Sequence, residues 1–321
     1  MTTQEAPQTF GNVSVEASAP ALLLQRAMEA VDDQMLAITQ KSEVELLRDT
    51  SRHILEAGGK RIRPRMLFLT YLACGGRDID ITVPVAAAVE LVHTASVVHD
   101  DINDHGVVRR GRPSINAIWG RTFALLTGDF LFTKVYELMS PYKDLNMVLA
   151  DATVALVEGE TLQAEAVKNK TFTREVYTRI IALKTAALFK AAAMLGALLA
   201  NADDEVVQAM GNFGYATGMA FQIVDDILDL TADESQLGKT AGIDLTQGKG
   251  LAAALNGEEA PESSPMDDIK RKAFDGDTIE KGIQQAEQFV QIALNSLEDL
   301  PESDEKEALA KLAWSVIKRD H

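Results

Sequence analysis

The chain has 321 residues, of which 46% are hydrophobic and 25% are charged, so it is long enough to bury a large core. Its formal net charge of −17 argues against nucleic acid or an anionic membrane surface as the main partner. The single cysteine excludes an internal disulfide and fits a reducing compartment, so we expect a cytoplasmic location.

The amino-terminal residues 1–19 are polar and contain neither the basic start nor the apolar core of a signal peptide, and we expect them to form a disordered tail. The most apolar stretch, Ile180 to Ala200, is interrupted by Lys184 and Lys190. Each of these lysines would cost about 2.5–3.5 kcal/mol at the centre of a bilayer. The stretch therefore favours a buried core helix, and we expect no integral membrane segment.

From Pro20 onward, hydrophobic residues recur at three- and four-residue steps, a pattern typical of helices. Long helices are expected over 118–139 and 146–168, and a further one begins at Thr173. No internal repeat and no strand-like alternation of useful length is present. The sequence predicts an all-α fold, with one domain over residues 20–321 and roughly ten or more helices around a central cavity.

A basic motif follows the second predicted helix. Gly58 and Gly59 end that helix, and Lys60 and Arg63 stand at the start of the next one, where Pro64 is tolerated in the first turn. A helix amino terminus with two cations can bind phosphate. In isolation, such a pair more often marks a basic turn exposed to water.

The central motif is an apolar run from Val83 to Val98 that leads into three aspartates, Asp100, Asp101 and Asp104. On a helix, His93, Asp100 and Asp104 share one face. Carboxylates this close repel one another unless a cation lies between them, and Mg²⁺, a hard ion with oxygen ligands, is the natural occupant. Two cations follow within two turns, Arg109 and Arg110, and indicate an anionic substrate, most simply a phosphate ester.

A second acidic cluster also follows an apolar helix. Its members lie at i, i+3, i+4 and i+7 and share one face: Gln222, Asp225, Asp226 and Asp229. One DDxxD cluster alone is a weak signal, but two with the same preceding pattern are much stronger and could face each other across one cavity. Lys239 and Lys249 follow in a segment rich in glycine and aspartate, which is typical of a loop.

Polar residues also interrupt two other helices. The end of the 146–168 helix carries Glu158, Glu160 and Gln163, which fit a wall of the same cavity and a solvent-exposed helix end equally well. Lys184 and Thr185 lie in an alanine-rich sequence. A lysine in such surroundings either extends its ammonium group to water or binds an anion.

With these motifs, the chain resembles the trans-prenyltransferases of the polyprenyl diphosphate synthase family. The resemblance extends from about Leu22 to Arg319. It rests on GGKRIRP at 58–64, DDIND at 100–104, RRGRPS at 109–114, GDFL at 128–131, EGETLQ at 158–163, KT at 184–185, FQIVDDILD at 221–229 and the GK pairs at 238–239 and 248–249. It implies an isoprenoid synthase fold and a homodimer, for which the 118–139 helix is a candidate interface, although a core position explains that helix equally well.

The resemblance also implies an activity and its residues. The enzyme would join isopentenyl diphosphate to an allylic diphosphate and release diphosphate, with two or three Mg²⁺ ions bound by the acidic clusters, Asp100, Asp101, Asp104, Asp225, Asp226 and Asp229. Isopentenyl diphosphate would be bound by Lys60, Arg63, His93 and Arg110. The allylic substrate would be bound by Arg109, Lys184, Thr185, Gln222, Lys239 and Lys249. Lys184 and Gln222 would act in catalysis with the first and last aspartate of each cluster.

Product length depends on where the growing tail ends. If the tail extends from the first acidic cluster back along its own helix, the residues one turn upstream set its limit. These are the small residues Ala95 and Ser96, and no aromatic side chain blocks this turn. The sequence therefore predicts a product of geranylgeranyl length or longer, unless Phe132 or Tyr136 closes the tunnel.

Two other function classes account for fewer of these residues. The pair His99-Asp100 after His93 is compatible with an HD-type metal-dependent phosphohydrolase, which uses histidine ligands. That activity would leave the second acidic cluster, Lys60 and Arg63 without a role. A regulatory subunit without activity would be expected to lose an acidic cluster, and both clusters are intact.

Overall fold

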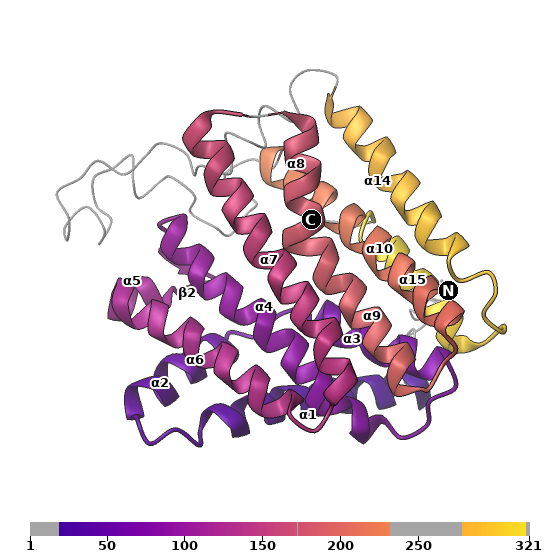
Figure 1. Cartoon of the computed structure of the whole chain (residues 1–321), viewed down its shortest axis with the longest axis horizontal. Helices are drawn as coiled ribbons and strands as arrows, with labels where there is room; N and C mark the ends of the chain where they lie inside the picture. Colours follow the sequence, from indigo (N-terminus) through magenta and orange to yellow (C-terminus); the bar gives the residue numbers. More distant parts are fainter. Residues whose placement is uncertain (1–18, 172, 232–277, 319–321) are drawn as a thin grey trace, which may run out of the picture.

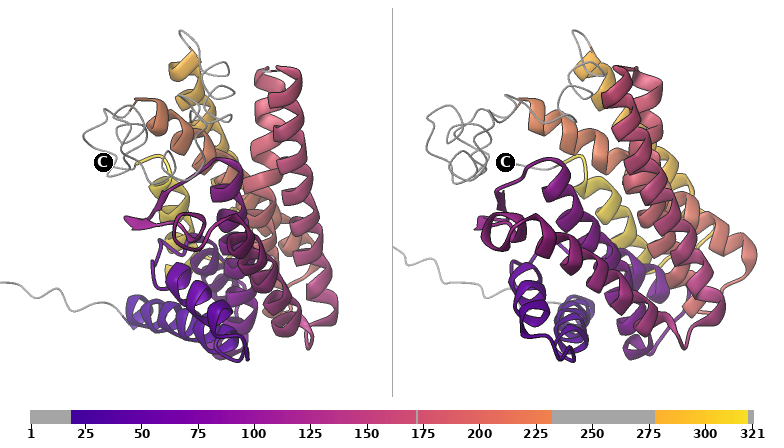
Figure 2. Two further views of the ribbon diagram at one scale, coloured as in Figure 1. Left: turned by 90° about the vertical axis from the view of Figure 1, so that its left-hand side faces the viewer. Right: turned by 60° about the vertical axis from the view of Figure 1, so that its left-hand side comes forward.

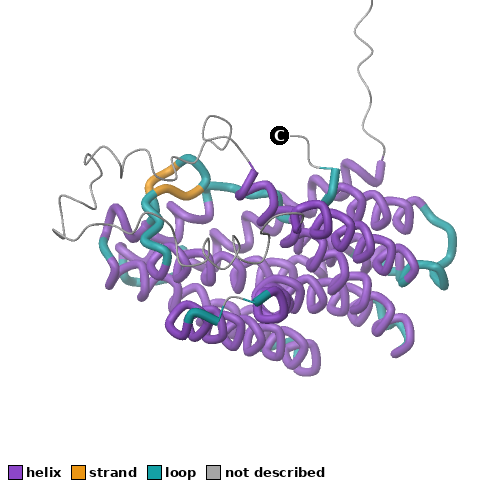
Figure 3. The backbone as a smooth tube through the Cα atoms, turned by 90° about the horizontal axis from the view of Figure 1, so that it is seen from above, coloured by secondary structure: helices purple, strands orange, loops and turns teal. Residues whose placement is uncertain are grey.

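The computed structural model describes residues 19–171, 173–231 and 278–318, and almost all of this part is helical (Figure 3). The longer helices lie side by side in a bundle (Figure 1). The helices are α1 Ala19–Thr39, α2 Glu45–Leu55, α3 Ile62–Ala73, α4 Val83–Asn103, α5 Ile115–Trp119, α6 Arg121–Met139, α7 Lys143–Asn169, α8 Arg174–Ile181, α9 Ala187–Leu199, α10 Asp204–Thr231, α14 Thr278–Asn295 and α15 Asp304–Ser315. The predicted all-α class is confirmed.

Three predictions fall outside the described residues. Lys239 and Lys249 lie outside them, and so does the expected amino-terminal tail except for Ala19, where α1 begins. These predictions stay predictions.

Helices α4 and α9 each pack against several other helices. Helix α4 packs against α6 and α1, and α9 packs against α3, α7 and α10, while α1 and α2 lie together at one end of the bundle (Figure 2). Two segments, Ile79–Asn103 and Arg174–Leu199, are long and apolar enough to cross a membrane, but 72% and 67% of their apolar windows are buried inside the fold. The stretch from Ile180 is thus part of the core, as its lysines predicted.

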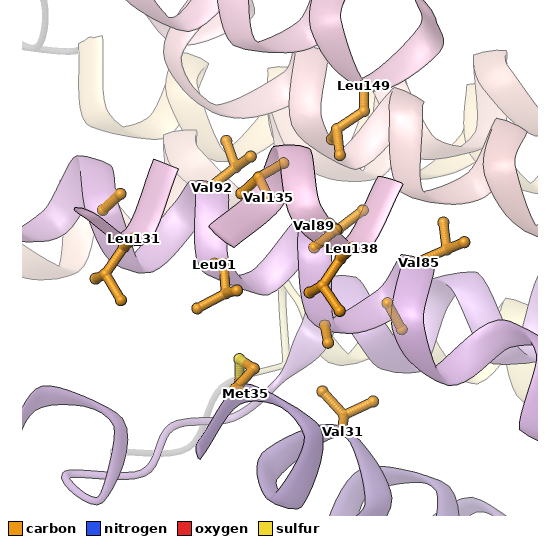
Figure 4. Close-up of a cluster of buried hydrophobic side chains, with 14 of the residues drawn as sticks. Val31, Met35, Val85, Val89, Leu91, Val92, Leu131, Val135, Leu138 and Leu149 are labelled. Carbon is orange, nitrogen blue, oxygen red and sulfur yellow. The ribbon is translucent and has the colours of Figure 1, made fainter. Parts of the chain in front are cut away.

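One of the two hydrophobic cores of the described chain lies between α1, α4, α6 and α7. Side chains from all four helices meet in it (Figure 4): Val31, Met35, Val85, Val89, Leu91, Val92, Leu131, Val135, Leu138 and Leu149. The second core joins α3, α8, α9, α10, α14 and α15. Because α4 ends in the first acidic cluster and α10 carries the second, burial of these helices fixes where the two clusters stand.

The structure corrects the predicted elements in two places. The helix expected over 118–139 is divided into α5 and α6 at Gly120, whose φ of 84° suits glycine and is rare for other residues. A two-stranded antiparallel hairpin, β1 Val108–Arg109 and β2 Arg112–Pro113, follows α4 where no strand was predicted. Its turn contains Arg110 and Gly111, both with positive φ, so the hairpin sets the direction of the basic pair.

Candidate active site

The first acidic cluster ends α4, and its three carboxylates differ in environment. Asp104 caps the helix, and the side chain of Asp100 is 25% exposed. Asp101, in contrast, is 3% exposed and accepts two hydrogen bonds from Arg109 of β1, at 2.9 Å from Nε and 2.6 Å from Nη2. Burial raises the pKa of Asp101, and the Arg109 hydrogen bonds oppose that shift. Asp101 is thus paired within the protein, although its place in DDxxD made it a predicted metal ligand.

Lys184 lies among acidic and amide groups from two other helices. Its Nζ is 2.5 Å from Glu160 Oε1 and 3.7 Å from Asp100 Oδ1, and it donates to Gln163 Oε1 at 2.9 Å. Gly159 lets α7 approach, because a Cβ there would lie 2.8 Å from Lys184 Cγ. The prediction left the place of Glu160 and Gln163 open; both face Lys184, whereas Glu158 is exposed.

The charges around Lys184 shift the titration of their neighbours. Burial raises the pKa of Glu160 to about 7, and the nearby charge of Asp100 adds to that shift, while Lys184 opposes it. Burial lowers the pKa of Lys184, but the charges of Asp100 and Glu160 outweigh this and raise that pKa above its ordinary value. One ammonium group therefore shares its charge between two carboxylates.

The middle aspartate of the second acidic cluster accepts hydrogen bonds from uncharged side chains. Asp226 is fully buried and accepts from Tyr177 Oη at 2.7 Å and from Gln222 Nε2 at 2.9 Å. Thr185 Oγ1 donates in turn to Gln222 Oε1 at 2.7 Å. Burial raises the pKa of Tyr177 well above its ordinary value, and Asp226 raises it further. Asp229 lies in α10 one turn later, and its side chain is outside the described set.

A single π-helical turn joins the two clusters. Residues Ala182–Ala186 form η2, the π turn between α8 and α9. Such turns hold one extra residue and are frequent at functional sites. Lys184 contacts Asp100 of the first cluster, and its neighbour Thr185 contacts Gln222 of the second. The predicted approach of the two motifs to one place is therefore visible in adjacent residues of one turn.

A cationic cluster lies beside these carboxylates. Arg63, 8% exposed, stacks its guanidinium 4.7 Å from the ring centroid of Phe189. Burial lowers the pKa of Arg63 to about 10, with Glu90 and Asp225 opposing that shift and Arg110 adding to it. Arg63 therefore lies within electrostatic reach of the second acidic cluster.

His93 and Arg110 complete the cationic cluster. Burial, and after it the charge of Arg63 and Arg110, lowers the pKa of His93 well below its ordinary value, so the imidazole is neutral at physiological pH. Arg63 Nε and Arg110 Nη1 are buried and have no hydrogen-bond partner among the described residues. Burying an unpaired guanidinium nitrogen is costly, and an anion bound there would remove that cost. Lys60, which precedes Arg63 by three residues, has an exposed side chain.

The residues predicted to set product length lie inside the bundle. Ala95 is fully buried, and Ser96, 9% exposed, donates to the backbone oxygen of His93 at 2.8 Å. Phe132 is half-buried, with its ring centroid 6.0 Å from that of His99. Tyr136 is 70% exposed, so it lines no interior space of this chain.

The histidines that the structure describes do not form the metal site that a phosphohydrolase would need. His99 turns toward α6, with Nε2 3.2 Å from Leu125 O and 3.6 Å from Asp129 Oδ1, while His93 lies among arginines. In the described ranges, no three His, Cys, Asp or Glu side chains lie close enough together to hold a metal ion. The HD-type alternative has no geometric support there.

Sequence reasoning missed three residues that support this site. Tyr177 binds Asp226, Gly159 makes room for Lys184, and Glu90, 2% exposed, lies one turn before His93 on α4. In sequence, a buried tyrosine and a helical glycine look like ordinary core residues. A charged residue such as Glu90 inside an apolar run was the one available signal, because buried charges need partners.

A mainly helical bundle with two acidic clusters and a cationic cluster is suited to an enzyme that acts on anionic substrates. The model of the polyprenyl synthetase family matches residues 44–285. The chain is 34% identical over 320 residues to a short chain isoprenyl diphosphate synthase of Methanothermobacter thermautotrophicus, which covers 93% of this chain and 98% of the relative. The chain belongs to the polyprenyl synthetase family, whose members transfer prenyl groups.

Other relatives differ in product. The chain is 36% identical over 309 residues to an all-trans-nonaprenyl-diphosphate synthase (geranyl-diphosphate specific) of Rhodobacter capsulatus, covering 90% of this chain and 94% of the relative. A solved polyprenyl synthase from Caulobacter crescentus, complexed with calcium and isoprenyl diphosphate, superposes with a TM-score of 0.79 at 30% identity, over 93% of this chain and 96% of that one. Similarity to both short-chain and long-chain enzymes establishes prenyl transfer and leaves product length open.

Proposed function

We propose that this chain condenses isopentenyl diphosphate with an allylic diphosphate in a Mg²⁺-dependent reaction that releases diphosphate and makes a geranylgeranyl or longer polyprenyl diphosphate. The observation that carries the proposal is the π turn η2, where Lys184 contacts Asp100 and Thr185 contacts Gln222. These contacts by adjacent residues support a common site for two acidic motifs from distant parts of the chain, as a reaction between two prenyl diphosphates needs.

The cationic cluster is suited to the acceptor substrate. Arg63 and Arg110 have buried guanidinium nitrogens without hydrogen-bond partners in the described part of the chain, and His93 is neutral beside them. Guanidinium groups bind phosphate oxygens through charge-assisted hydrogen bonds, often in pairs. These residues, with Lys60, would hold the diphosphate of isopentenyl diphosphate, while Arg109, Lys184, Thr185, Gln222, Lys239 and Lys249 would contact the allylic diphosphate.

The acidic residues fit Mg²⁺. Asp100 and Glu160 share one lysine, and burial together with Asp100 raises the pKa of Glu160 to about 7, so a further cation is electrostatically favoured there. Mg²⁺ takes one or two carboxylates and completes its octahedron with water and substrate phosphate. Asp100, Asp104 and Asp225 would hold the ions together with Asp229, whereas Asp101 and Asp226 would orient their neighbours through Arg109 and Tyr177. When bound, Mg²⁺ would neutralise the charge that develops on the leaving diphosphate.

The chain's own residues would bind and orient the two substrates and would exclude water from the reacting carbons. Cleavage of the allylic C–O bond leaves diphosphate and an allylic cation, whose carbon then bonds to the double bond of isopentenyl diphosphate, and the released diphosphate takes the proton lost afterwards. Lys184 would stabilise the departing charge through its ammonium group. The buried apolar residues of α4, among them Ala95 and Val92, would exclude water that otherwise quenches the cation.

Incubation with isopentenyl diphosphate, Mg²⁺ and allylic primers of several lengths tests the proposal. We expect diphosphate release together with a longer prenyl product sized by chromatography. Release of orthophosphate without carbon–carbon bond formation would overturn it. Ala95→Phe, which fills the turn upstream of Asp100, should shorten the product, whereas Tyr136→Phe, at a side chain 70% exposed, should leave its length unchanged.

A second copy of the chain is the partner we propose for the face of α6 and α7. Large apolar side chains stand 42–61% exposed there: Phe123, Leu125, Leu126, Met147, Val154 and Val157. Exposed apolar patches of this kind typically mark protein interfaces. A homodimer in the cytoplasm, with α6 at its interface, accounts for them. Light scattering should give twice the chain mass, and Leu126→Glu should shift it toward that of one chain.

A further inference from the structure

The loop between α2 and α3 has an unusual backbone. Gly58, Gly59 and Arg61 all have positive φ, of 72°, 153° and 47°. Glycine adopts such values without steric cost, but an arginine there requires compensating contacts. Arg61 is also the amino-terminal cap of α3, and its backbone oxygen accepts from Arg65 N at 3.0 Å. The start of α3, where Arg63 lies, therefore depends on how Arg61 is held.

The Arg61 side chain is tied to three separate elements. Its Nε donates to Asp32 Oδ1 of α1 at 2.8 Å, its Nη1 to Glu90 Oε1 of α4 at 2.9 Å, and its Nη2 to Leu55 O at the end of α2 at 3.2 Å. The side chains of Arg61 and Glu90 are only 5% and 3% exposed. Because each guanidinium nitrogen has a protein partner and the side chain is buried, we expect Arg61 to act on a substrate through its neighbours.

The neighbours of this ion pair are the predicted ligands of one diphosphate. Lys60 precedes Arg61, Arg63 follows two residues later, and Arg110 lies against Gly59, where a Cβ would be 2.9 Å from its Cζ. Glu90 stands one turn before His93 on α4. Its negative charge also partly offsets the mutual repulsion of the arginines, since it acts to raise the pKa of both Arg63 and Arg110 against the effect of burial.

We propose that the Arg61–Glu90 ion pair is a positioning device for the isopentenyl diphosphate subsite: it holds the left-handed turn that directs Lys60, Arg63 and Arg110 toward one diphosphate. The inference rests on the proposed function. If the ion pair only stabilised the fold, its removal would change the affinities for the two substrates by the same factor or would change neither. A positioning pair affects one substrate selectively.

The double variant Arg61→Met/Glu90→Leu tests this. It removes both charges together, so no unpaired charge is left buried between α3 and α4. We expect KM for isopentenyl diphosphate to rise by about tenfold or more, as the loss of one charge-assisted phosphate contact predicts, with KM for the allylic primer changed by less than about twofold. Calorimetric titration with isopentenyl diphosphate should show a matching rise in Kd.

Lys306→Met is the matched control. Lys306 also anchors a connection between two helices, since its Nζ lies 2.7 Å from Glu302 Oε1 and 2.8 Å from Leu300 O between α14 and α15. We expect this variant to lower Tm and to leave both KM values unchanged. Arg61→Lys, which keeps one charge but cannot reach all three partners, should raise KM for isopentenyl diphosphate by an intermediate factor and serves if the double variant does not fold.

The outcomes separate two failures. Unchanged affinity for isopentenyl diphosphate in the double variant, or in Arg61→Lys if that variant alone folds, would overturn the positioning role, and so would an equal rise of both KM values. Absence of any prenyl product from the wild-type chain would instead overturn the proposed function. Calorimetry on the wild type then still shows whether isopentenyl diphosphate binds at all.

Discussion

The two acidic clusters bury their middle carboxylates in opposite ways. Asp101 faces the guanidinium of Arg109, a full opposite charge supplied by the hairpin after α4. Asp226 faces the hydroxyl of Tyr177 and the amide of Gln222, two neutral donors. The same DDxxD spacing therefore does not imply the same partners for the buried carboxylate. Among the described contacts, Asp101 has a charge pair with Arg109, and Asp226 accepts hydrogen bonds from Tyr177 and Gln222.

The outer carboxylates, in contrast, should be equivalent, and their loss should have the largest effect. We expect Asp100→Asn and Asp225→Asn each to lower kcat by about a hundred- to a thousandfold, because each would remove a carboxylate that holds Mg²⁺ against the leaving diphosphate. Steady-state kinetics at saturating Mg²⁺ measure this. Asp49→Asn, at an exposed position of α2, is the control and should retain full activity. A large loss in only one of the two variants would make the clusters unequal in catalysis.

Arg109→Met should show the charge dependence of the first cluster. It leaves Asp101, 3% exposed, without its cation, so the free energy of unfolding should fall by about 3 kcal/mol. Urea denaturation measures this change. Replacing both partners, as Arg109→Met/Asp101→Leu, removes the unpaired charge and should recover most of the loss. A double variant as unstable as the single one would contradict this account.

Tyr177→Phe should affect the second cluster less. Asp226 keeps its hydrogen bond from Gln222, so the loss in unfolding free energy should be about 1–2 kcal/mol. The same denaturation experiment compares it with Arg109→Met. Tyr215→Phe, at a partly exposed side chain of α10, the helix that carries Asp226, is the control and should change stability little. A loss as large as that of Arg109→Met would remove the distinction between the clusters.

The last expected effect concerns pH. The pKa of Glu160 is about 7 in the folded chain against an ordinary 4.5, so the folded state retains a proton that the unfolded state has released. Its contribution to stability is therefore complete below the lower value and is lost as pH rises through about 7. In the presence of a chelator, Glu160→Gln should have a higher Tm than wild type at about pH 8, with the difference vanishing at about pH 4.5.

Repeating the Tm measurements with Mg²⁺ tests whether the ion binds near Glu160. If the ion binds beside Asp100, its charge favours the ionised form of Glu160 and lowers its pKa. The Tm advantage of the glutamine variant at high pH should then shrink. Parallel Tm profiles of the two proteins across the whole pH range would show that Glu160 has no shifted titration.

Sequence alone predicted much of this arrangement because helical spacing is reliable. The i, i+3, i+4 pattern of Gln222, Asp225 and Asp226 placed them together without any tertiary information. The partners that decide what each carboxylate does could not be predicted, because they come from other elements. Asp32 and Glu90 each lie 29 residues from Arg61, in opposite directions, and Tyr177 is 49 residues from Asp226. Only the fold brings such groups together.

Irregular backbone was also beyond sequence reasoning. The helix break at Gly120 lies in an apolar run that suits a continuous helix, and the π turn over Ala182–Ala186 has no sequence signal. Propensity is a weak guide where tertiary packing decides the backbone.

Because of the π turn, the positions of Lys184 and Thr185 depend on the number of residues in this segment more than on which residues they are. Each residue along a helix turns the next by about 100°, so deletion of Ala182 would restore an ordinary helix and rotate Lys184 and Thr185 away from their partners unless α9 rotated instead. Either adjustment breaks contacts, in the acidic clusters or in the core. Substitution of Ala182 by serine should therefore be tolerated, whereas its deletion should abolish product formation in the same assay even where circular dichroism still reports a helical protein.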